Sequence, residues 1–231
     1  MKIATDPRFL AAGFTAGTLS RHAGNMAEIK NQEDVYTQFH INPAHILHLH
    51  QVHGNKLITV SSLQQSAQIQ QNALQDADGW LLSPTVSGWG AAILTADCVP
   101  LFVWNASGTH AALSHCGWRG IVQELPFQTA RALMQTGAQG PFYAWAGPHI
   151  QKCCFEVQQD TAEKFPQETI VKNGKLFVDL NQAVRAQLLR AGLHEKDIVL
   201  SPACTCCDKE NFFSWRRDHI RNLLLSFIYK K

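Results

Sequence analysis

The chain has 231 residues, enough for one large domain or two small ones, and its 45% hydrophobic and 16% charged residues favour a sizeable core over disorder. The formal net charge of +2 and the lack of a basic run argue against nucleic-acid binding. No apolar stretch has transmembrane length, and the first residues lack the apolar run of a signal peptide, so no membrane contact is expected. Seven cysteines, an odd number, then indicate reduced thiols and a cytoplasmic location.

The first third of the chain predicts one helix and a hairpin. Residues 31–41 are compatible with a helix capped by Asn31. Residues 45–53 alternate in polarity, a Gly-Asn turn follows, and residues 56–60 form a short apolar run, which together predict a β-hairpin. The glutamine-rich residues 61–75 are expected on the surface.

Strands are expected through the middle of the chain. Apolar runs predict them at 89–100, 100–105 and 109–115, and the first run is typical of a strand buried on both faces. A helix with Pro126 in its first turn should follow, because proline is tolerated there. Residues 141–150 predict another strand that runs into a loop.

The clearest helical pattern follows an expected strand at 176–180. Asp179 and Gly192 are typical residues for the start and end of that helix. Helical spacing also occurs near the C-terminus, at Ile220, Leu223, Leu224, Phe227 and Ile228. With no internal repeat and no linker, we expect one α+β domain over 1–231, with a mixed β-sheet or sandwich core flanked by helices.

Three histidines lie within six residues at His48, His50 and His53. His53 stands beside Gly54 at an expected strand end, where a ligand can approach closely. Imidazole is a common metal ligand, although the alternative of an exposed or simply hydrogen-bonded histidine is at least as frequent.

Cys98 follows a buried-type strand and an acid, Asp97. A cysteine at such a place is a metal ligand, a nucleophile or a small core residue. The carboxylate of Asp97 needs a partner or a cleft, which favours a functional site, and we consider it a candidate for assisting proton transfer.

The segment HCGWRG places His115, Trp118 and Arg119 within five residues. An indole face and a guanidinium fork suit a planar ring together with an anion. The alternative is a buried turn with Arg119 in a structural ion pair.

Together, His53, Cys98 and His115 resemble the three-ligand pattern of catalytic zinc, which activates water or polarises an oxygen. Copper suits the same donors, so residue types alone do not decide the metal. A competing hypothesis makes Cys98 a thiolate nucleophile and His115 its base, without a metal, in a hydrolase or amidase.

Two motifs nearer the C-terminus also have alternatives. CTCC, with Cys204, Cys206 and Cys207, contains the Cys-x-x-Cys spacing of half a structural zinc site, but the pair Cys153-Cys154 is adjacent rather than spaced, and simple burial is the alternative. A non-catalytic role in redox or metal binding through these thiols is a further hypothesis.

FFSWRRD (212–218) places Arg216 and Arg217 beside aromatic residues. These arginines are candidates for binding an anion or stacking on a base, and an ion pair with Asp218 at a helix start is the alternative.

Several motifs occur in one order: HQVHG, DADGW, LTADCVPLF, HCGWRG, AGPHI with CCFEV, and CTCC with FFSWRRD. In this joint order the sequence resembles the laccase-domain proteins, also called the multicopper polyphenol oxidase or purine nucleoside phosphorylase family. The resemblance covers about residues 50–218.

The resemblance implies a zinc ion held by His53, Cys98 and His115. It implies phosphorolysis of adenosine, inosine and methylthioadenosine, adenosine deamination as a further activity, and a purine nucleoside and phosphate as partners. Phosphate is then expected at Arg119 with Arg216 or Arg217, and the base on Trp118 or an aromatic of FFSW. The implied fold is similar to the catalytic domain of cytotoxic necrotising factors, which are Cys/His deamidases.

The family was earlier described as copper-dependent phenol oxidases. That activity is the weakest on chemistry, because several coppers need many histidines and only the 48–53 cluster among the 11 histidines is dense. The chain departs from the family pattern at 16–28 and 218–222, and we expect both segments to border the substrate pocket.

Overall fold

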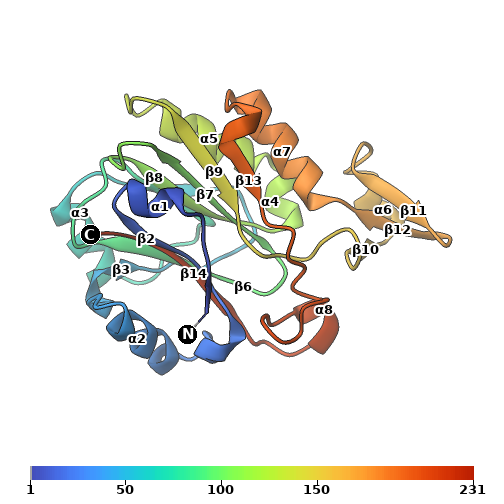
Figure 1. The fold of residues 1–231 in the computed structure, drawn as a ribbon, viewed down its shortest axis with the longest axis horizontal. Coiled ribbons are helices and arrows are strands. Elements are labelled where there is room, and N and C mark those ends of the chain that lie inside the picture. The colour runs from blue at the N-terminus through green and yellow to red at the C-terminus, as the bar shows by residue number, and fades with distance from the viewer. Residues whose placement is uncertain (1) are drawn as a thin grey trace.

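Two mixed β-sheets pack face to face in the computed structural model, which describes residues 2–231 (Figure 1). The five-stranded sheet has the order β1 (Ile3–Ala4), β2 (Phe14–Leu19), β14 (Leu224–Lys230), β6 (Gly90–Thr95) and β3 (Ile46–Leu47). Its first four strands are antiparallel, and β3 is parallel to β6.

The six-stranded sheet has the order β13 (Ile198–Leu200), β9 (Phe142–Ala146), β7 (Val99–Asn105), β8 (Ala111–Cys116), β5 (Gly79–Leu82) and β4 (Leu57–Val60). The outer strands β13 and β4 are parallel to their neighbours, and the inner strands are antiparallel. A small antiparallel sheet of β10 (Glu156–Val157), β12 (Lys175–Val178) and β11 (Thr169–Lys172) projects to one side (Figure 1).

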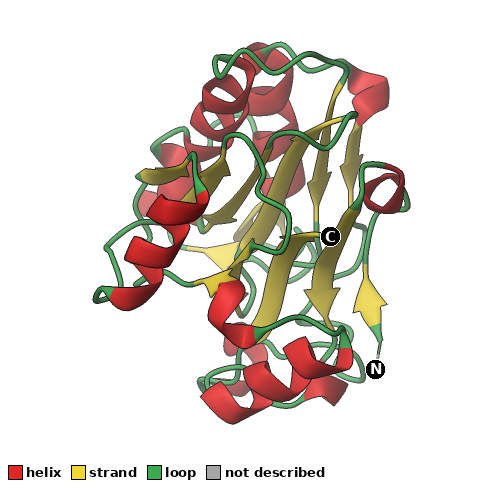
Figure 2. Ribbon diagram, turned by 90° about the vertical axis from the view of Figure 1, so that its left-hand side faces the viewer, coloured by secondary structure: helices red, strands yellow, loops and turns green. Residues whose placement is uncertain are grey.

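Helices cover the outer faces of the two sheets (Figure 2). The six-stranded sheet carries α4 (Trp118–Val122), α5 (Leu125–Met134) and α7 (Leu180–Ala191), and the five-stranded sheet carries α2 (Ile29–Gln38). The remaining helices are α1 (Arg8–Ala11), α3 (Leu63–Gln71), α6 (Gln159–Ala162) and α8 (Trp215–Asp218), and 3₁₀ turns lie at η1 (Arg21–Ala23), η2 (Pro43–His45) and η3 (Glu195–Asp197).

The strand β7 explains how the layers form. Its Leu101 and Val103 pack in the core under the helices, while Phe102 and Trp104 pack between the two sheets, and all four are fully buried. Alternate side chains of a strand face opposite sides, so a strand between two apolar layers is an unbroken apolar run. The predicted α+β class with a mixed-sheet core is therefore confirmed.

The helical spacing near the C-terminus does not correspond to a helix. Residues 224–230 are β14, which lies between β2 and β6 in the five-stranded sheet. Leu225 and Phe227 pack toward α2, and Ile228 packs between the sheets. Because both faces are buried, the segment is apolar at nearly every position, and some of those positions match helical spacing by composition alone.

The predicted hairpin is also wrong. β3 pairs with β6 in one sheet, whereas β4 pairs with β5 in the other, so residues 48–56 cross between the sheets instead of turning back. The predicted first helix exists as α2, but it starts after Glu28, and Asn31 lies inside it and donates to Asn25 O.

Two other helices agree with the sequence. Asp179 Oδ1 accepts from Gln182 N at the start of α7, and Gly192 ends that helix with a φ of +109°. Pro126 lies in the first turn of α5. None of the helices in the described range has the length and apolar character needed to span a bilayer.

Candidate active site

His53, Cys98 and His115 meet where the chain passes between the two sheets. His53 lies in the β3–β4 link and Cys98 in the β6–β7 link, and both links cross from the five-stranded to the six-stranded sheet. His115 lies in β8. One ligand atom from each lies within 4.8 Å of the others, and exposure rises from buried His115 through Cys98 to exposed His53. The set therefore offers three donors and an open side, as a catalytic zinc site requires.

A buried carboxylate orients this set. Asp78 Oδ1 is 2.9 Å from His115 Nδ1 and also accepts from His53 N at 2.9 Å, while Oδ2 accepts from Gly54 N at 2.7 Å and Val52 N at 3.2 Å. Engaging Nδ1 of His115 leaves its Nε2 for a metal, and such carboxylate–histidine pairs commonly orient metal ligands. The motif DADGW contributes to the family resemblance, but nothing in the sequence predicts this role for Asp78.

The backbone at Gly117 makes room for the three side chains. A Cβ at this residue would lie 3.1 Å from His53 Cδ2 and 3.2 Å from Cys98 Sγ. Gly117 has an extended backbone with φ −65°, so it is required here for close approach rather than for an unusual conformation. The donor set and this cradle both fit a metal ion.

The electrostatics within this set favour an ion pair between Cys98 and His115. Burial raises the pKa of the Cys98 thiol, but the charges and hydrogen bonds of His115 and His53 outweigh it and lower the pKa to about 6. Burial lowers the pKa of His115, but the Cys98 thiolate and Asp78 raise it to about 9. Burial likewise raises the pKa of Asp78, and its hydrogen bonds hold it below the usual range. A thiolate at neutral pH is competent both as a ligand and as a nucleophile.

Two cavities, of about 470 and 380 Å³, open from this set. Cys98 and His53 line both of them, as do Trp215 and Arg221. Each volume falls within the usual range for small-molecule sites.

Arg119 and Trp118, two predicted substrate-binding residues, line the larger cavity. The Arg119 guanidinium lies 4.4 Å from the Trp118 ring centroid, is exposed, and forms no ion pair with another residue of the described chain. Its donors are thus available to an anion.

Arg216 and Asp97 also line the larger cavity, but they are partly committed to each other. Asp97 Oδ2 accepts from Arg216 N at 2.7 Å, and Oδ1 accepts from Thr205 Oγ1 at 2.6 Å. Arg216 Nη1 donates to the carbonyls of Cys154 and Glu156. This geometry favours a positioning role for Asp97 over the predicted proton transfer, and leaves Arg216 Nε and Nη2 available to a ligand.

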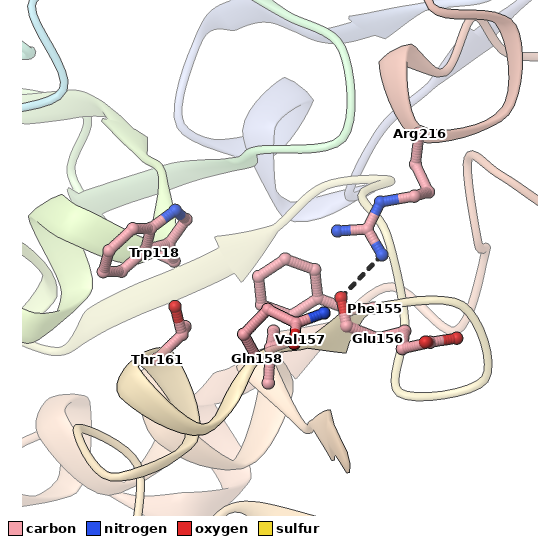
Figure 3. A pocket seen from close by; sticks show the side chains of 7 residues that line it. All are labelled: Trp118, Phe155, Glu156, Val157, Gln158, Thr161 and Arg216. Carbon is pink, nitrogen blue, oxygen red and sulfur yellow. Dashed lines mark hydrogen bonds between the residues drawn. The ribbon is translucent and has the colours of Figure 1, made fainter. Parts of the chain in front are cut away.

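The groove in Figure 3 adjoins this cavity and shares Trp118, Phe155 and Arg216 with it. The Arg216 side chain extends toward Phe155 and Glu156 there, and Thr161 faces Trp118 across the groove (Figure 3). Phe155 was absent from the predicted site, because CCFEV alone does not reveal which side chain faces the groove.

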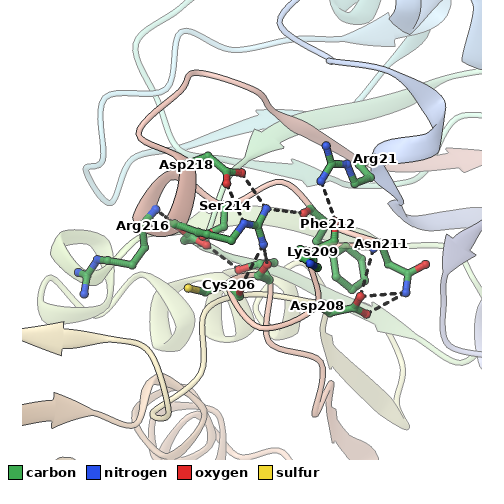
Figure 4. Close-up of polar contacts among 12 residues, drawn as sticks. Arg21, Cys206, Asp208, Lys209, Asn211, Phe212, Ser214, Arg216 and Asp218 are labelled. Carbon is green, nitrogen blue, oxygen red and sulfur yellow. Dashed lines mark hydrogen bonds and ion pairs between the residues drawn. The ribbon is translucent and has the colours of Figure 1, made fainter.

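The structure does not bring Arg217 to the cavity. Its Nε and Nη2 form two 2.7 Å bonds to Asp218, and its Nη1 and Nη2 also donate to the carbonyls of Thr205, Cys206 and Phe212. In Figure 4, Cys206, Phe212 and Asp218 lie around these contacts, and Arg216 points away from them. The ion-pair alternative therefore describes Arg217, which holds the loop before α8.

The two divergent segments differ in position. Arg221 lines both cavities, as expected for 218–222. The lining residues include none of 16–28, all of which the structure describes, so that expectation is wrong. Instead, Arg21 Nη1 donates to Lys209 O (Figure 4). Its guanidinium also lies over the Phe213 ring. Residues 16–28 therefore contact the loop before α8 through Arg21, on the side away from the cavities.

The protein thus belongs to a class in which a Cys/His set lies where two mixed sheets meet and forms an open site that can hold one metal ion. Residues 14–229 match the family described as multi-copper polyphenol oxidoreductase laccase, and the chain belongs to this family.

Several relatives of known name are similar to the chain. It is 34% identical over 180 residues to a purine nucleoside phosphorylase of Xylella fastidiosa, which covers 74% of this chain and 66% of that protein. It is 34% identical over 158 residues to adenosine deaminase RL5 of an unknown prokaryotic organism, covering 64% and 60%.

The chain is also similar to purine nucleoside phosphorylase YlmD of Geobacillus stearothermophilus. The two are 31% identical over 199 residues, covering 78% of this chain and 70% of that protein. The crystal structure of YlmD from that organism superposes with a TM-score of 0.87 at 26% identity, covering 98% of this chain and 94% of the other.

Proposed function

We propose that this protein is a zinc-dependent purine nucleoside phosphorylase acting on adenosine, inosine and methylthioadenosine, with adenosine deamination as a second activity. The names of its relatives support this reaction class. The observation that carries the proposal is one cavity lined by His53 and Cys98 of the His53–Cys98–His115 set, by the unpaired Arg119 and by two indoles.

In this proposal phosphate binds Arg119, and Arg216 offers further donors from α8. Trp118 or Trp215 stacks on the purine, since both indoles border the cavity and both are at least partly exposed to solvent. Phosphate then attacks the anomeric carbon as the purine leaves. The role of the arginine is to hold the anion in line with that carbon, which lowers the entropic part of the barrier.

His53, Cys98 and His115 would hold the zinc ion, which supplies Lewis acidity for water or for a substrate oxygen. Asp78 fixes the ring orientation of His115, and Gly117 keeps the space between the ligands open. Copper at this site is the alternative for the metal. A multicopper centre has less support, because in the described part of the chain only one other group of three or more potential ligands exists, and it consists of cysteines.

The second candidate is a hydrolase or amidase in which Cys98 attacks and His115 is the base. The closeness of Cys98 to His115 and the lowered pKa of the Cys98 thiol, about 6, support this candidate, and they suit a metal ligand equally. A thiol-reactive probe distinguishes the two: labelling of Cys98 only after metal removal supports a ligand, and labelling in the metal-loaded protein supports a nucleophile.

The phosphorolysis test uses inosine with and without phosphate, at defined zinc and copper contents. Hypoxanthine that appears only with phosphate supports the proposal. Failure to form hypoxanthine at any metal content refutes it for that substrate. Elemental analysis of protein purified without added metal identifies which ion the site carries.

A further inference from the structure

We propose that Cys153, Cys154, Cys204 and Cys207 form a second metal site, which binds one Zn²⁺ ion through four thiolates and fastens two loops behind the substrate cavity. Their Sγ atoms all lie within 4.8 Å of one another. The four cysteines share no residue with the His53–Cys98–His115 set, and the inference does not depend on which reaction the protein catalyses.

The sulfur spacing suits a shared metal ion. Zinc–thiolate bonds of about 2.3 Å in a tetrahedron separate neighbouring sulfurs by about 3.8 Å. Cys207 Sγ lies 3.5 Å from Cys153 Sγ and 3.2 Å from Cys154 Sγ, and all four thiols are free. A disulfide requires about 2 Å. Small movements from these positions would surround one ion with four sulfurs.

The backbone explains how adjacent cysteines can act together. Gln151 O accepts from both Cys154 N and Phe155 N, which curls the chain tightly and presents Cys153 and Cys154 to the same partner. The other pair has Cys-x-x-Cys spacing, which is common in structural zinc sites. Adjacency, which argued against zinc in the sequence, is therefore no obstacle once the turn is known.

Backbone contacts hold the two cysteine-bearing loops side by side. His149 and Cys204 form an isolated parallel bridge, with Thr205 N donating to His149 O at 3.1 Å. Gln151 N donates to Cys204 Sγ at 3.4 Å, and a backbone amide directed at sulfur stabilises the charge of a metal-bound thiolate. Cys204 is buried, while Cys153 and Cys207 are exposed, so one side is anchored and an ion can enter from the other.

Both loops hold parts of the substrate cavity. The first loop supplies Phe155 and the carbonyls that hold Arg216, and the second supplies Thr205, which donates to Asp97. Four thiolates leave no open position for water or substrate, so the ion is structural. Its effect on the cavity is to fix the carbonyls that hold the Arg216 side chain and the Thr205 hydroxyl that holds Asp97.

The test counts zinc in protein purified without a metal-affinity tag and without added metal. We expect two zinc ions per chain in the wild type, one in Cys98→Ser, one in Cys207→Ser and none in the double variant. Cys206→Ser is the matched control, because Cys206 lies in the same loop but outside the group of four, and it should retain two. Cobalt-loaded Cys98→Ser should show intense sulfur-to-cobalt charge-transfer absorption that the double variant lacks.

A Cys98→Ser protein without metal would overturn the proposal, as would an ion in that protein that survives the added Cys207→Ser change. A disulfide among the four cysteines, found by mass mapping of protein kept free of oxygen, would also overturn it. If the Cys207 variants do not fold, the zinc count and cobalt spectrum of Cys98→Ser alone decide the question.

Discussion

Replacing Asp78 by Asn should weaken the metal site without removing any ligand. The carboxylate is fully buried and accepts four hydrogen bonds, from His115 Nδ1 and from the amides of residues 52–54. Asparagine keeps only one acceptor oxygen, so its NH₂ group must face a donor, and the negative charge beside His115 is lost. Loss of such a partner typically lowers metal affinity 10–100-fold, which corresponds to about 1.4–2.7 kcal/mol.

The assay is a zinc titration against a competing chelator, with turnover measured in parallel. Asp76→Asn is a matched control two residues away, because Asp76 pairs with His50 at 2.7 Å where both side chains are mostly exposed. An exposed pair of this kind contributes little, so the control should keep wild-type affinity. Equal zinc affinity in Asp78→Asn and Asp76→Asn would refute the positioning role of Asp78.

Three further changes test other parts of the structure. Arg119→Ala should raise the KM for phosphate by at least about 10-fold in steady-state kinetics, since a hydrogen bond to a charged group contributes about 1.5–3 kcal/mol. Gly117→Ala should lower zinc affinity in the chelator titration, because its Cβ would crowd His53 and Cys98. His149 is fully buried and its pKa is lowered to about 4 by burial, so the unfolded chain binds the proton first as pH falls below 6.5. His149 should therefore contribute about 3 kcal/mol of stability near pH 7 that is lost by about pH 4, measured by urea unfolding of the wild type against His149→Asn.

Each of these changes has a control and a contradicting result. Arg190→Ala removes a guanidinium that also lies over an aromatic ring but outside the two cavities, and an equal KM effect there would argue against Arg119. Gly54→Ala places its Cβ at an ordinary 3.6 Å from Asp78, so zinc loss should be confined to Gly117→Ala. An unchanged pH slope in His149→Asn would contradict the histidine assignment.

The hydrogen bonds around His149 also favour its neutral form, in agreement with the lowered pKa. Its Nδ1 lies 2.8 Å from Gly147 O, and its Nε2 lies 3.1 Å from Gln151 Nε2. The neutral ring with a proton on Nδ1 satisfies both contacts, whereas a second proton would face the Gln151 amide. Gln151 cannot reverse its amide without losing the bond from Asn181 to Oε1 at 2.7 Å.

The three residues of the candidate metal site could be selected from the sequence because they carry distinctive chemistry at strand ends. His53, Cys98 and His115 stood out by residue type and motif, and the structure brings them together. Asp78 did not stand out, because its partner His115 is 37 residues away and an acid in a turn is ordinary. The sequence around either residue gives no sign of a hydrogen bond between two residues that lie so far apart in the chain.

Arg216 and Arg217 show another limit. Adjacent arginines in α8 are equivalent by composition, but the helix directs one to the cavity and the other to Asp218. Trp215 and Arg221 lie in segments that the family resemblance already placed near the substrate, and the structure shows that both line the two cavities. The sequence pattern was also misleading at β14. Both faces of this strand are buried, so it lacks the alternation of polar and apolar residues that identifies a strand.

The position of β14 has a consequence for synthesis of the chain. Residues 224–230 fill the slot between β2 and β6, strands that leave the ribosome more than a hundred residues earlier. Until then these two strands have unpaired edges, which are prone to bind other chains. The six-stranded sheet has β13, its last strand in chain order, at an edge, so its inner strands can pair beforehand. Because the links that carry His53 and Cys98 are anchored in both sheets, we expect the site to be complete only after β14 has inserted.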